Sequence, residues 1–306
     1  MKRTSLLIFT LLLVFFNSAS IQAESTSNEL NWVGCGITKK AFMDELAKAY
    51  EKKTGIHINI DGGGATKGIR AVAAGTADIG GSCRSVLNAL PEERDAKQTP
   101  VAWDALVIIV NNKNKVKNLA LEQLKAIYLG KIKNWREVGG ADAPIELYVR
   151  QGKLSGVGRM LRELVFGNYE QEFVATHVVD SSGPLEKEIE DNVNAIGVTG
   201  VSSAIRRNLK ILSLDGVEPS YENIKAAKYS LYRPLYLISN RNNTNPFIDE
   251  FINFALSREG QEIIKKAGSI PYSEAMALIM YQIERDQQVN REGITGEGQW
   301  NPNLQQ

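Results

Sequence analysis

The sequence predicts an α/β protein with a largely parallel sheet, and both the order of its segments and its composition support this. Apolar, strand-like segments recur along the chain, and several end in a glycine-rich or small-residue loop that leads into a helix-like segment. That alternation is typical of βαβ units, whose strands run parallel and whose ligands bind at the carboxyl ends of the strands. The 306 residues are 43% hydrophobic and 23% charged, which is ordinary for a globular chain, and at roughly 100–200 residues per domain they could form two domains.

The first third of the chain shows this alternation most clearly. Strands are expected at residues 30–33, 57–61 and 77–81, and small-residue loops follow at 34–36, 62–66 and 82–84. Thr38 is expected to cap a helix that ends at Gly55, because its hydroxyl can accept a hydrogen bond from a free N–H of the first turn. A second helix is expected around Ile69 and Val72.

The remainder of the chain repeats the pattern. A continuous apolar strand is expected at 105–110, which suits a sheet covered on both faces. Further strands are expected at 145–150, 195–199 and 235–239, with helices at 121–129, 160–165, 185–191 and, as two abutting helices, 247–267. The Gln- and Asn-rich tail after Tyr281 is expected to pack loosely. No internal repeat or low-complexity linker is visible, so any domains are expected to be interleaved along the sequence.

The N-terminus has the layout of a secretory signal peptide. Lys2 and Arg3 precede an apolar run at 6–16, and small residues lead to a cleavage site after Ala23. The mature chain is therefore expected to be exported. In an oxidising compartment its two cysteines, Cys35 and Cys83, could form a disulfide or remain separate buried thiols, and spacing alone leaves both readings open.

Composition and motifs disfavour most other function classes. Lys+Arg (36) and Asp+Glu (35) nearly balance, so no net charge drives the chain toward nucleic acid. With two histidines and two cysteines, the chain has few residues that could form a metal site or support His-based catalysis. His57 and His177 are expected to face solvent. The dinucleotide fingerprint, the phosphate loop of NTPases and the nucleophile elbow of α/β hydrolases are all missing from the sequence.

Three loops have the composition of an anion site. Residues 34–38, 62–66 and 155–158 lead into helices, where converging N–H groups and the helix dipole favour an anion. Thr38, Thr66 and Ser155 add hydroxyl groups, and Arg84 and Arg150 follow strands and could offer planar forks to the same oxygens. Ordinary turn chemistry is the alternative explanation of these glycines.

At this point the sequence resembles the periplasmic phosphate-binding proteins of phosphate ABC transporters. The matching segments, in the same order along residues 30–270, are 34–38 (GCGIT), 64–68 (GATKG), 77–84 (ADIGGSCR), 127–132 (IYLGKI) with Trp135, 150–156 (RQGKLSG), 195–197 (AIG) and 232–236 (YRPLY). The resemblance implies the type II periplasmic-binding-protein fold, with two α/β lobes joined by two crossover strands. It implies one lobe at 24–107 plus 236–306 and another at 108–235, with crossings at 105–110 and 232–239.

The resemblance also implies a set of phosphate ligands. By position these are Ile37, Thr38, Ala65, Thr66, Cys83, Arg84, Arg150, Ser155, Gly156 and Val157. The sequence departs from the family pattern at three places. Val157 replaces a threonine, Arg150 stands one residue further from Ser155 than is usual, and Cys83 stands where one branch has an acid that accepts the phosphate proton, although another branch reads Ser-Arg there. Asp61 and Asp180 are the other candidates for that acceptor.

The resemblance implies a periplasmic binding protein that is not an enzyme, carries no cofactor or metal, and does not bind nucleic acid. It is expected to act as a monomer that captures inorganic phosphate and delivers it to a membrane ABC permease. The alternatives are a binder of another tetrahedral oxyanion, a phosphate sensor or adhesion protein, and an exported phosphate-ester hydrolase. Because loops after neighbouring parallel strands emerge at the same edge, the resemblance favours a disulfide between Cys35 and Cys83.

Overall fold

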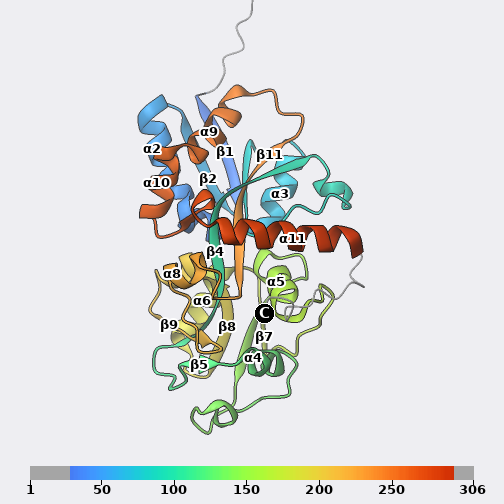
Figure 1. The fold of residues 1–306 in the computed structure, drawn as a ribbon, viewed down its shortest axis with the longest axis vertical. Coiled ribbons are helices and arrows are strands. Elements are labelled where there is room, and N and C mark those ends of the chain that lie inside the picture. Colours follow the sequence, from blue (N-terminus) through green and yellow to red (C-terminus); the bar gives the residue numbers. More distant parts are fainter. Residues whose placement is uncertain (1–27, 293–306) are drawn as a thin grey trace, which may run out of the picture.

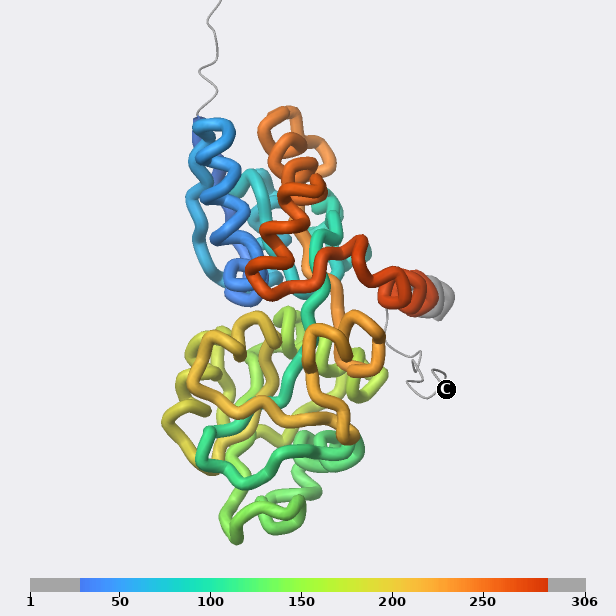
Figure 2. The backbone as a smooth tube through the Cα atoms, turned by 60° about the vertical axis from the view of Figure 1, so that its left-hand side comes forward, coloured from blue at the N-terminus to red at the C-terminus, as the bar shows by residue number. Residues whose placement is uncertain are grey.

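The computed structural model describes residues 28–292, which form two α/β lobes joined by a pair of long strands (Figure 1). The N-terminal and C-terminal segments share one lobe, and the middle of the chain forms the other (Figure 2). The expected signal peptide at 1–23 lies outside the described residues. Within residues 28–292, none of the helices is long and apolar enough to cross a bilayer.

The first lobe is built on three parallel strands. β1 (Glu29–Gly34), β2 (His57–Gly62) and β3 (Ile79–Ser82) confirm the three strands that the sequence predicts, and β1 lies between the other two. Trp32 on β1 is fully buried, and its indole lies so close to Gly81 that a Cβ there would come within 2.1 Å of it. The helices of this lobe are α1 (Gly36–Thr38), the π-helix η1 (Lys39–Met43), α2 (Asp44–Thr54) and α3 (Ala65–Ala73), with a 3₁₀ turn η2 (Pro91–Glu93).

Two antiparallel strands connect the lobes. β4 (Ala96–Asn111) pairs along its first part with β11 (Tyr232–Asn240) and along its second part with β8 (Ala195–Gly200). Every residue of β4 from 101 onward is buried, which confirms the expected continuous apolar strand and extends it at both ends. Arg233 on β11 and Asp104 on β4 form an ion pair of 3.1 Å in which neither side chain has exposed surface. The predicted residue bounds of the two lobes remain a prediction.

The second lobe repeats the parallel arrangement. β6 (Glu146–Arg150) lies between β8 and β7 (His177–Val179), parallel to both. The helices α5 (Gly156–Leu161), continued by η4 (Arg162–Phe166), and α6 (Ser182–Asp191) follow β6 and β7. The smaller elements are β5 (Asn118–Leu119), α4 (Leu121–Tyr128), η3 (Trp135–Val138), α7 (Val201–Ala204), β9 (Leu209–Ile211), β10 (Ser213–Leu214) and α8 (Tyr221–Lys225).

The C-terminal segment returns to the first lobe. α9 (Pro246–Leu256) and α10 (Arg258–Lys266) abut at Ser257, which confirms the two expected helices. β12 (Ile270–Pro271) pairs with β4, and after η5 (Tyr272–Glu274) the chain forms α11 (Met276–Glu292). The chain after Tyr281 thus continues as a helix, and Gln282 and Arg285 are buried, so the expectation of a loosely packed tail is wrong for residues 282–285. α11 is anchored by fully buried Leu278 and lies across the junction of the lobes (Figure 1).

Candidate functional site

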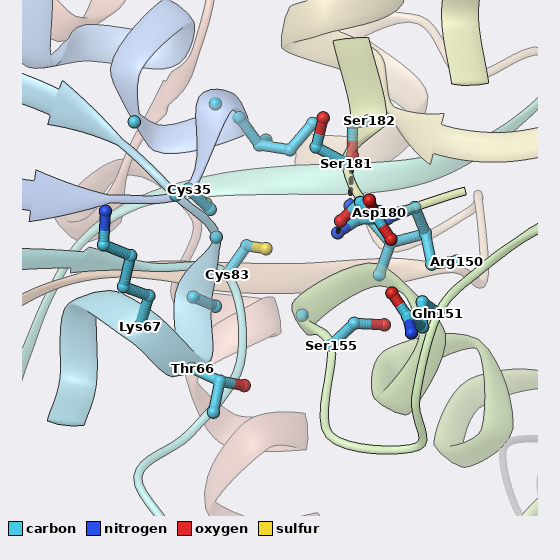
Figure 3. A pocket seen from close by; sticks show the side chains of 18 of the residues that line it. Cys35, Thr66, Lys67, Cys83, Arg150, Gln151, Ser155, Asp180, Ser181 and Ser182 are labelled. Carbon is cyan, nitrogen blue, oxygen red and sulfur yellow. Dashed lines mark hydrogen bonds between the residues drawn. The ribbon is translucent and has the colours of Figure 1, made fainter. Parts of the chain in front are cut away.

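A cavity of about 620 Å³ lies between the two lobes, at the carboxyl ends of their parallel strands. Figure 3 shows side chains from both lobes turned toward it. Its lining comes from four short segments and one cysteine. These are residues 35–37, 62–67, 150–157 except Lys153, and 180–183, together with Cys83.

Four helices begin at this cavity, each directly after a parallel strand. α1 begins after β1 and continues through η1 and α2 as one helical run, α3 begins after β2, α5 after β6, and α6 after β7. None of the four has an acidic residue in its first turn, whereas α4, α9 and α10 each carry one there. The first N–H groups of a helix have no partner within it, so these four helix starts offer donors and positive dipole ends to the cavity.

Arg150 contributes a cation to this cavity, in addition to Lys67, whose ammonium group is paired with Asp61. Its guanidinium donates to the carbonyls of Val179 (3.3 Å) and Asp180 (2.5 Å) and to the hydroxyl of Ser182 (2.9 Å). Burial lowers the pKa of this guanidinium below its ordinary value. All of these acceptors are neutral, and none of the carboxylates in the described part of the chain forms an ion pair with Arg150. The cavity therefore holds a largely buried positive charge that lacks a counter-charge in contact.

The lobes touch one another beside the cavity. A Cβ added to Gly156 would lie 2.4 Å from the Cys83 sulfur and 3.0 Å from the Ala65 methyl group, so only glycine allows the second lobe to approach this closely. Thr66 spans the same contact, because its hydroxyl donates to the carbonyl of Leu154 at 2.7 Å. Its side-chain oxygen is thus engaged between the lobes, and its backbone is what it offers to a ligand.

The structure places Arg84 behind the wall of the cavity. Its guanidinium forms two bonds with the Glu93 carboxylate, at 2.6 and 2.9 Å, and both side chains are fully buried. The remaining donors go to the carbonyls of Leu154 (2.9 Å) and Ser85 (2.8 Å) and to the Thr66 hydroxyl (3.1 Å). Arg84 is therefore a positioning residue for the contact between the lobes. The sequence predicts it to be a ligand residue, but it does not line the cavity.

Thr38 also lies away from the cavity surface, and it is not the helix cap. Cys35 occupies the cap position, where its sulfur accepts from the Thr38 N–H at 3.4 Å. The Thr38 hydroxyl is fully buried and donates to the carbonyl of Cys35 at 2.9 Å. The helix starts three residues earlier than predicted, because the loop after β1 is only one residue long.

The predicted disulfide is not present. Cys35 and Cys83 are both free and buried. The prediction that their loops meet is correct, since β1 and β3 are neighbours with Gly34 opposite Gly81. Topology thus explains why the two cysteines lie on neighbouring loops, and it does not determine their oxidation state.

Sequence reasoning named Asp180 as a candidate acceptor but missed the three residues that follow it in the cavity wall, Ser181 and the first two residues of α6, Ser182 and Gly183. The pair Ser181-Ser182 before Gly183 has the same small-residue composition as the three recognised loops, and that signal could have identified them. Lys67 was also missed, although it lies in a recognised motif, and its ammonium group is paired with Asp61 at 3.1 Å. His57 and His177 lie outside the cavity on exposed strand positions, as predicted.

Comparisons with known proteins agree with this architecture. The family model described as a PBP superfamily domain matches residues 33–259. The phosphate-binding protein PstS of Borreliella burgdorferi is 30% identical over 278 residues, which cover 88% of this chain and 98% of that protein. Among solved structures, a phosphate ABC transporter substrate-binding protein with bound phosphate from Clostridium perfringens is 31% identical with a TM-score of 0.73, covering 79% of this chain and 99% of that one. An ABC-type phosphate transport receptor from Vibrio cholerae is 28% identical with a TM-score of 0.61 and the same two coverages.

The ion pair between Arg84 and Glu93 generates a stability prediction. We expect Glu93→Gln to lower the free energy of unfolding by about 3 kcal/mol or more, because a fully buried guanidinium loses its counter-charge. Glu92→Gln is the matched control, since Glu92 is exposed, and its effect should stay within about 0.5 kcal/mol. Urea unfolding of the two variants measures the difference. Equal stabilities would contradict the assignment of Glu93 as the partner that holds Arg84.

Proposed function

This chain belongs to the PBP superfamily and, within it, to the phosphate-binding proteins, and from that premise we propose that it captures inorganic phosphate between its lobes and delivers it to an ABC importer. One observation carries the proposal. Four helix starts without a carboxylate in their first turns converge on a cavity whose arginine has no carboxylate in contact. Such a cavity favours a small multi-oxygen anion, because both the N–H donors and the guanidinium gain from negative charge.

The proposed ligands come from both lobes. The backbone N–H groups of Ile37, Ala65 and Thr66 would donate from the first lobe, beside the Cys83 thiol. From the second lobe, Arg150 would direct one or two of its guanidinium N–H groups to the anion, beside the Ser155 hydroxyl and the N–H groups of Gly156 and Val157. The replacement of a threonine by valine at position 157 removes a hydroxyl and leaves this N–H in place. Thr38 and Arg84 support these groups from behind.

Delivery defines the cellular role that we propose. The leading segment 1–23 would direct export, and the mature protein would work as a periplasmic monomer that meets a membrane permease in its ligand-bound form. It would bind and release phosphate without chemical change, as a substrate-binding protein does.

Calorimetric titration with phosphate, sulfate and molybdate is the direct test of this function. We expect saturable binding of phosphate at one site, with phosphate recovered unchanged after incubation. Sulfate and molybdate should bind more weakly. The absence of binding to any of the three oxyanions would refute the proposed function, and turnover of phosphate esters would replace it with an enzymatic one.

Arg150→Ala should weaken phosphate binding at least tenfold, which corresponds to about 1.4 kcal/mol. The variant removes the one guanidinium of the cavity that has no carboxylate in contact. Arg136→Ala, an exposed arginine of the same lobe paired with Asp142, is the control and should leave the affinity unchanged. Arg150→Lys keeps the charge without the fork and should fall between the two. Unchanged affinity in Arg150→Ala would show that the hydrogen bonds of Arg150 to residues 179–182 are purely structural.

Asp180 is the proposed acceptor of the phosphate proton. It lines the cavity, whereas Asp61, the other candidate, does not and is paired with Lys67. Phosphate near neutral pH retains a proton that can be donated to a carboxylate, while fully ionised sulfate would face that carboxylate with no proton between them. Such a mismatch costs about 1–3 kcal/mol or more when charge is involved.

Asp180→Asn should therefore lower the ratio of phosphate affinity to sulfate affinity by at least tenfold. Asp61→Asn provides the control with the same change of side chain at a site outside the cavity. Both ratios come from competition titrations at one pH. An unchanged ratio in Asp180→Asn would remove Asp180 from the specificity of the site.

A further inference from the structure

The two lobes also meet outside the cavity, where Lys40 of the first lobe contacts three residues of the second. Its ammonium group donates to the Ser203 hydroxyl at 3.0 Å and lies 3.4 Å from a carboxylate oxygen of Glu186. In the opposite direction, the Arg206 guanidinium donates to the main-chain carbonyl of Lys40 at 2.8 Å. Each lobe thus extends a cation to the other. We call this group the interlobe clasp, and its members are Lys40, Glu186, Ser203 and Arg206.

Glu186 is fully buried, and residues of its own lobe hold its carboxylate in place. The Thr199 hydroxyl donates to one oxygen at 2.6 Å, and the Arg207 guanidinium donates to the other at 3.1 Å. Arg207 also pairs with Glu190 at 3.4 Å, so two carboxylates of the second lobe share one guanidinium. The ammonium group of Lys40 supplies a second positive charge to them. Because the Glu186 carboxylate is already oriented within its own lobe, it is a preorganised partner for Lys40.

The clasp lies about one helical turn behind two of the four helix starts at the cavity. Ile37 lines the cavity in α1, and Lys40 follows three residues later in η1. Gly183 lines the cavity at the start of α6, and Glu186 follows three residues later on the same helix. Closure of the lobes therefore brings together the N–H donors at these helix starts and, one turn further on, the charges of Lys40 and Glu186. Opening of the lobes separates both.

We propose that the interlobe clasp stabilises the closed arrangement of the lobes, and that Lys40 is a positioning residue that raises the phosphate affinity of the cavity without touching the anion. This inference rests on the proposed function, since it concerns the affinity of the same site. A ligand that requires the closed arrangement binds with an apparent affinity proportional to the fraction of molecules that can close. The clasp increases that fraction, and its contacts must break before the anion leaves.

Attraction of the anion by any nearby positive charge is the competing explanation, and Lys39 separates the two. Lys39 precedes Lys40 in the sequence, and the exposed fractions of the two side chains are similar, at 38% and 30%. Lys39 pairs with Asp44 of its own lobe at 2.8 Å. Lys39→Met and Lys40→Met therefore remove the same charge from neighbouring positions, whereas Lys40→Met also breaks an ion pair between the lobes.

Calorimetry and the release of radiolabelled phosphate into an excess of unlabelled phosphate test the clasp. We expect Lys40→Met to weaken phosphate binding by about tenfold, mostly through faster release. Lys39→Met should stay within about twofold of the wild type in both measurements. The unfolding temperature of the ligand-free protein detects a merely structural effect. It should be nearly equal in the two variants, because Glu186 keeps Thr199 and Arg207 as partners when Lys40 is replaced.

Arg206→Ala tests the clasp from the second lobe. It removes the hydrogen bonds from Arg206 to the carbonyls of Lys40 (2.8 Å) and Ala267 (3.4 Å) in the first lobe, and it leaves the partners of Glu186 in place. Binding should again weaken through faster release, whereas Arg136→Ala should leave the release rate unchanged. If Lys40→Met does not fold, this second pair of variants decides the question.

Affinity and release rate at wild-type values in both Lys40→Met and Arg206→Ala would overturn the inference while leaving phosphate capture intact. An equal loss of affinity in Lys39→Met and Lys40→Met, or a loss that arises from slower association, would also overturn it, because either result indicates attraction by charge. If the wild-type protein binds none of phosphate, sulfate and molybdate, the proposed function itself fails, and the proposed effect of the clasp on affinity fails with it.

Discussion

The direction of the parallel strands is the constraint on which the site depends. The carboxyl ends of four parallel strands, two in each lobe, face the other lobe, so the helix that follows each of these four begins at the cavity. β1, β2, β6 and β7 each deliver a helix start there. Backbone N–H groups cannot be neutralised by titration and require no particular side chain. The tendency to bind an anion therefore follows from the topology. The side chains preserve this tendency, because no acidic residue lies in the first turn of any of the four helices.

Three buried or partly buried arginines show how the fold divides its positive charge. Arg84 is neutralised by Glu93 and Arg233 by Asp104, with all four side chains fully buried. Both pairs lie behind the cavity, and the pair of Arg233 with Asp104 connects segments distant in the sequence. Arg150 differs because its acceptors are two carbonyls and a hydroxyl. These neutral groups hold the guanidinium in place, and its positive charge has no carboxylate in contact. A charge that is positioned by neutral groups can gain more from an incoming anion than one already paired, because no ion pair has to be broken.

The sequence predicts the elements better than it predicts the roles of single polar residues. Strand 105–110 and the helices at 247–267 follow from apolar periodicity, which burial enforces directly. Thr38 and Arg84 were assigned to the ligand, but their partners, Cys35 O and Glu93, depend on a one-residue loop and on a turn nine residues downstream. Residues 181–183 were missed because β7 has only three residues and leaves little periodicity to detect. Pairing of strands brings the two cysteines together, but proximity alone does not decide whether thiols are oxidised.

Contacts around the cavity couple closure of the lobes to binding. The carbonyl of Leu154 in the second lobe accepts from both Thr66 and Arg84 in the first, and on another side of the junction Lys40 reaches Ser203 at 3.0 Å. Each lobe alone presents only two of the four helix starts, so an anion held by one lobe leaves half of the donors unused. An anion can shift the lobes toward closure only by its difference in affinity between the two arrangements, and here that difference consists of the donors that closure adds. The buried ion pair of Arg233 with Asp104 links the two crossover strands, so closure can bring the same donors together each time.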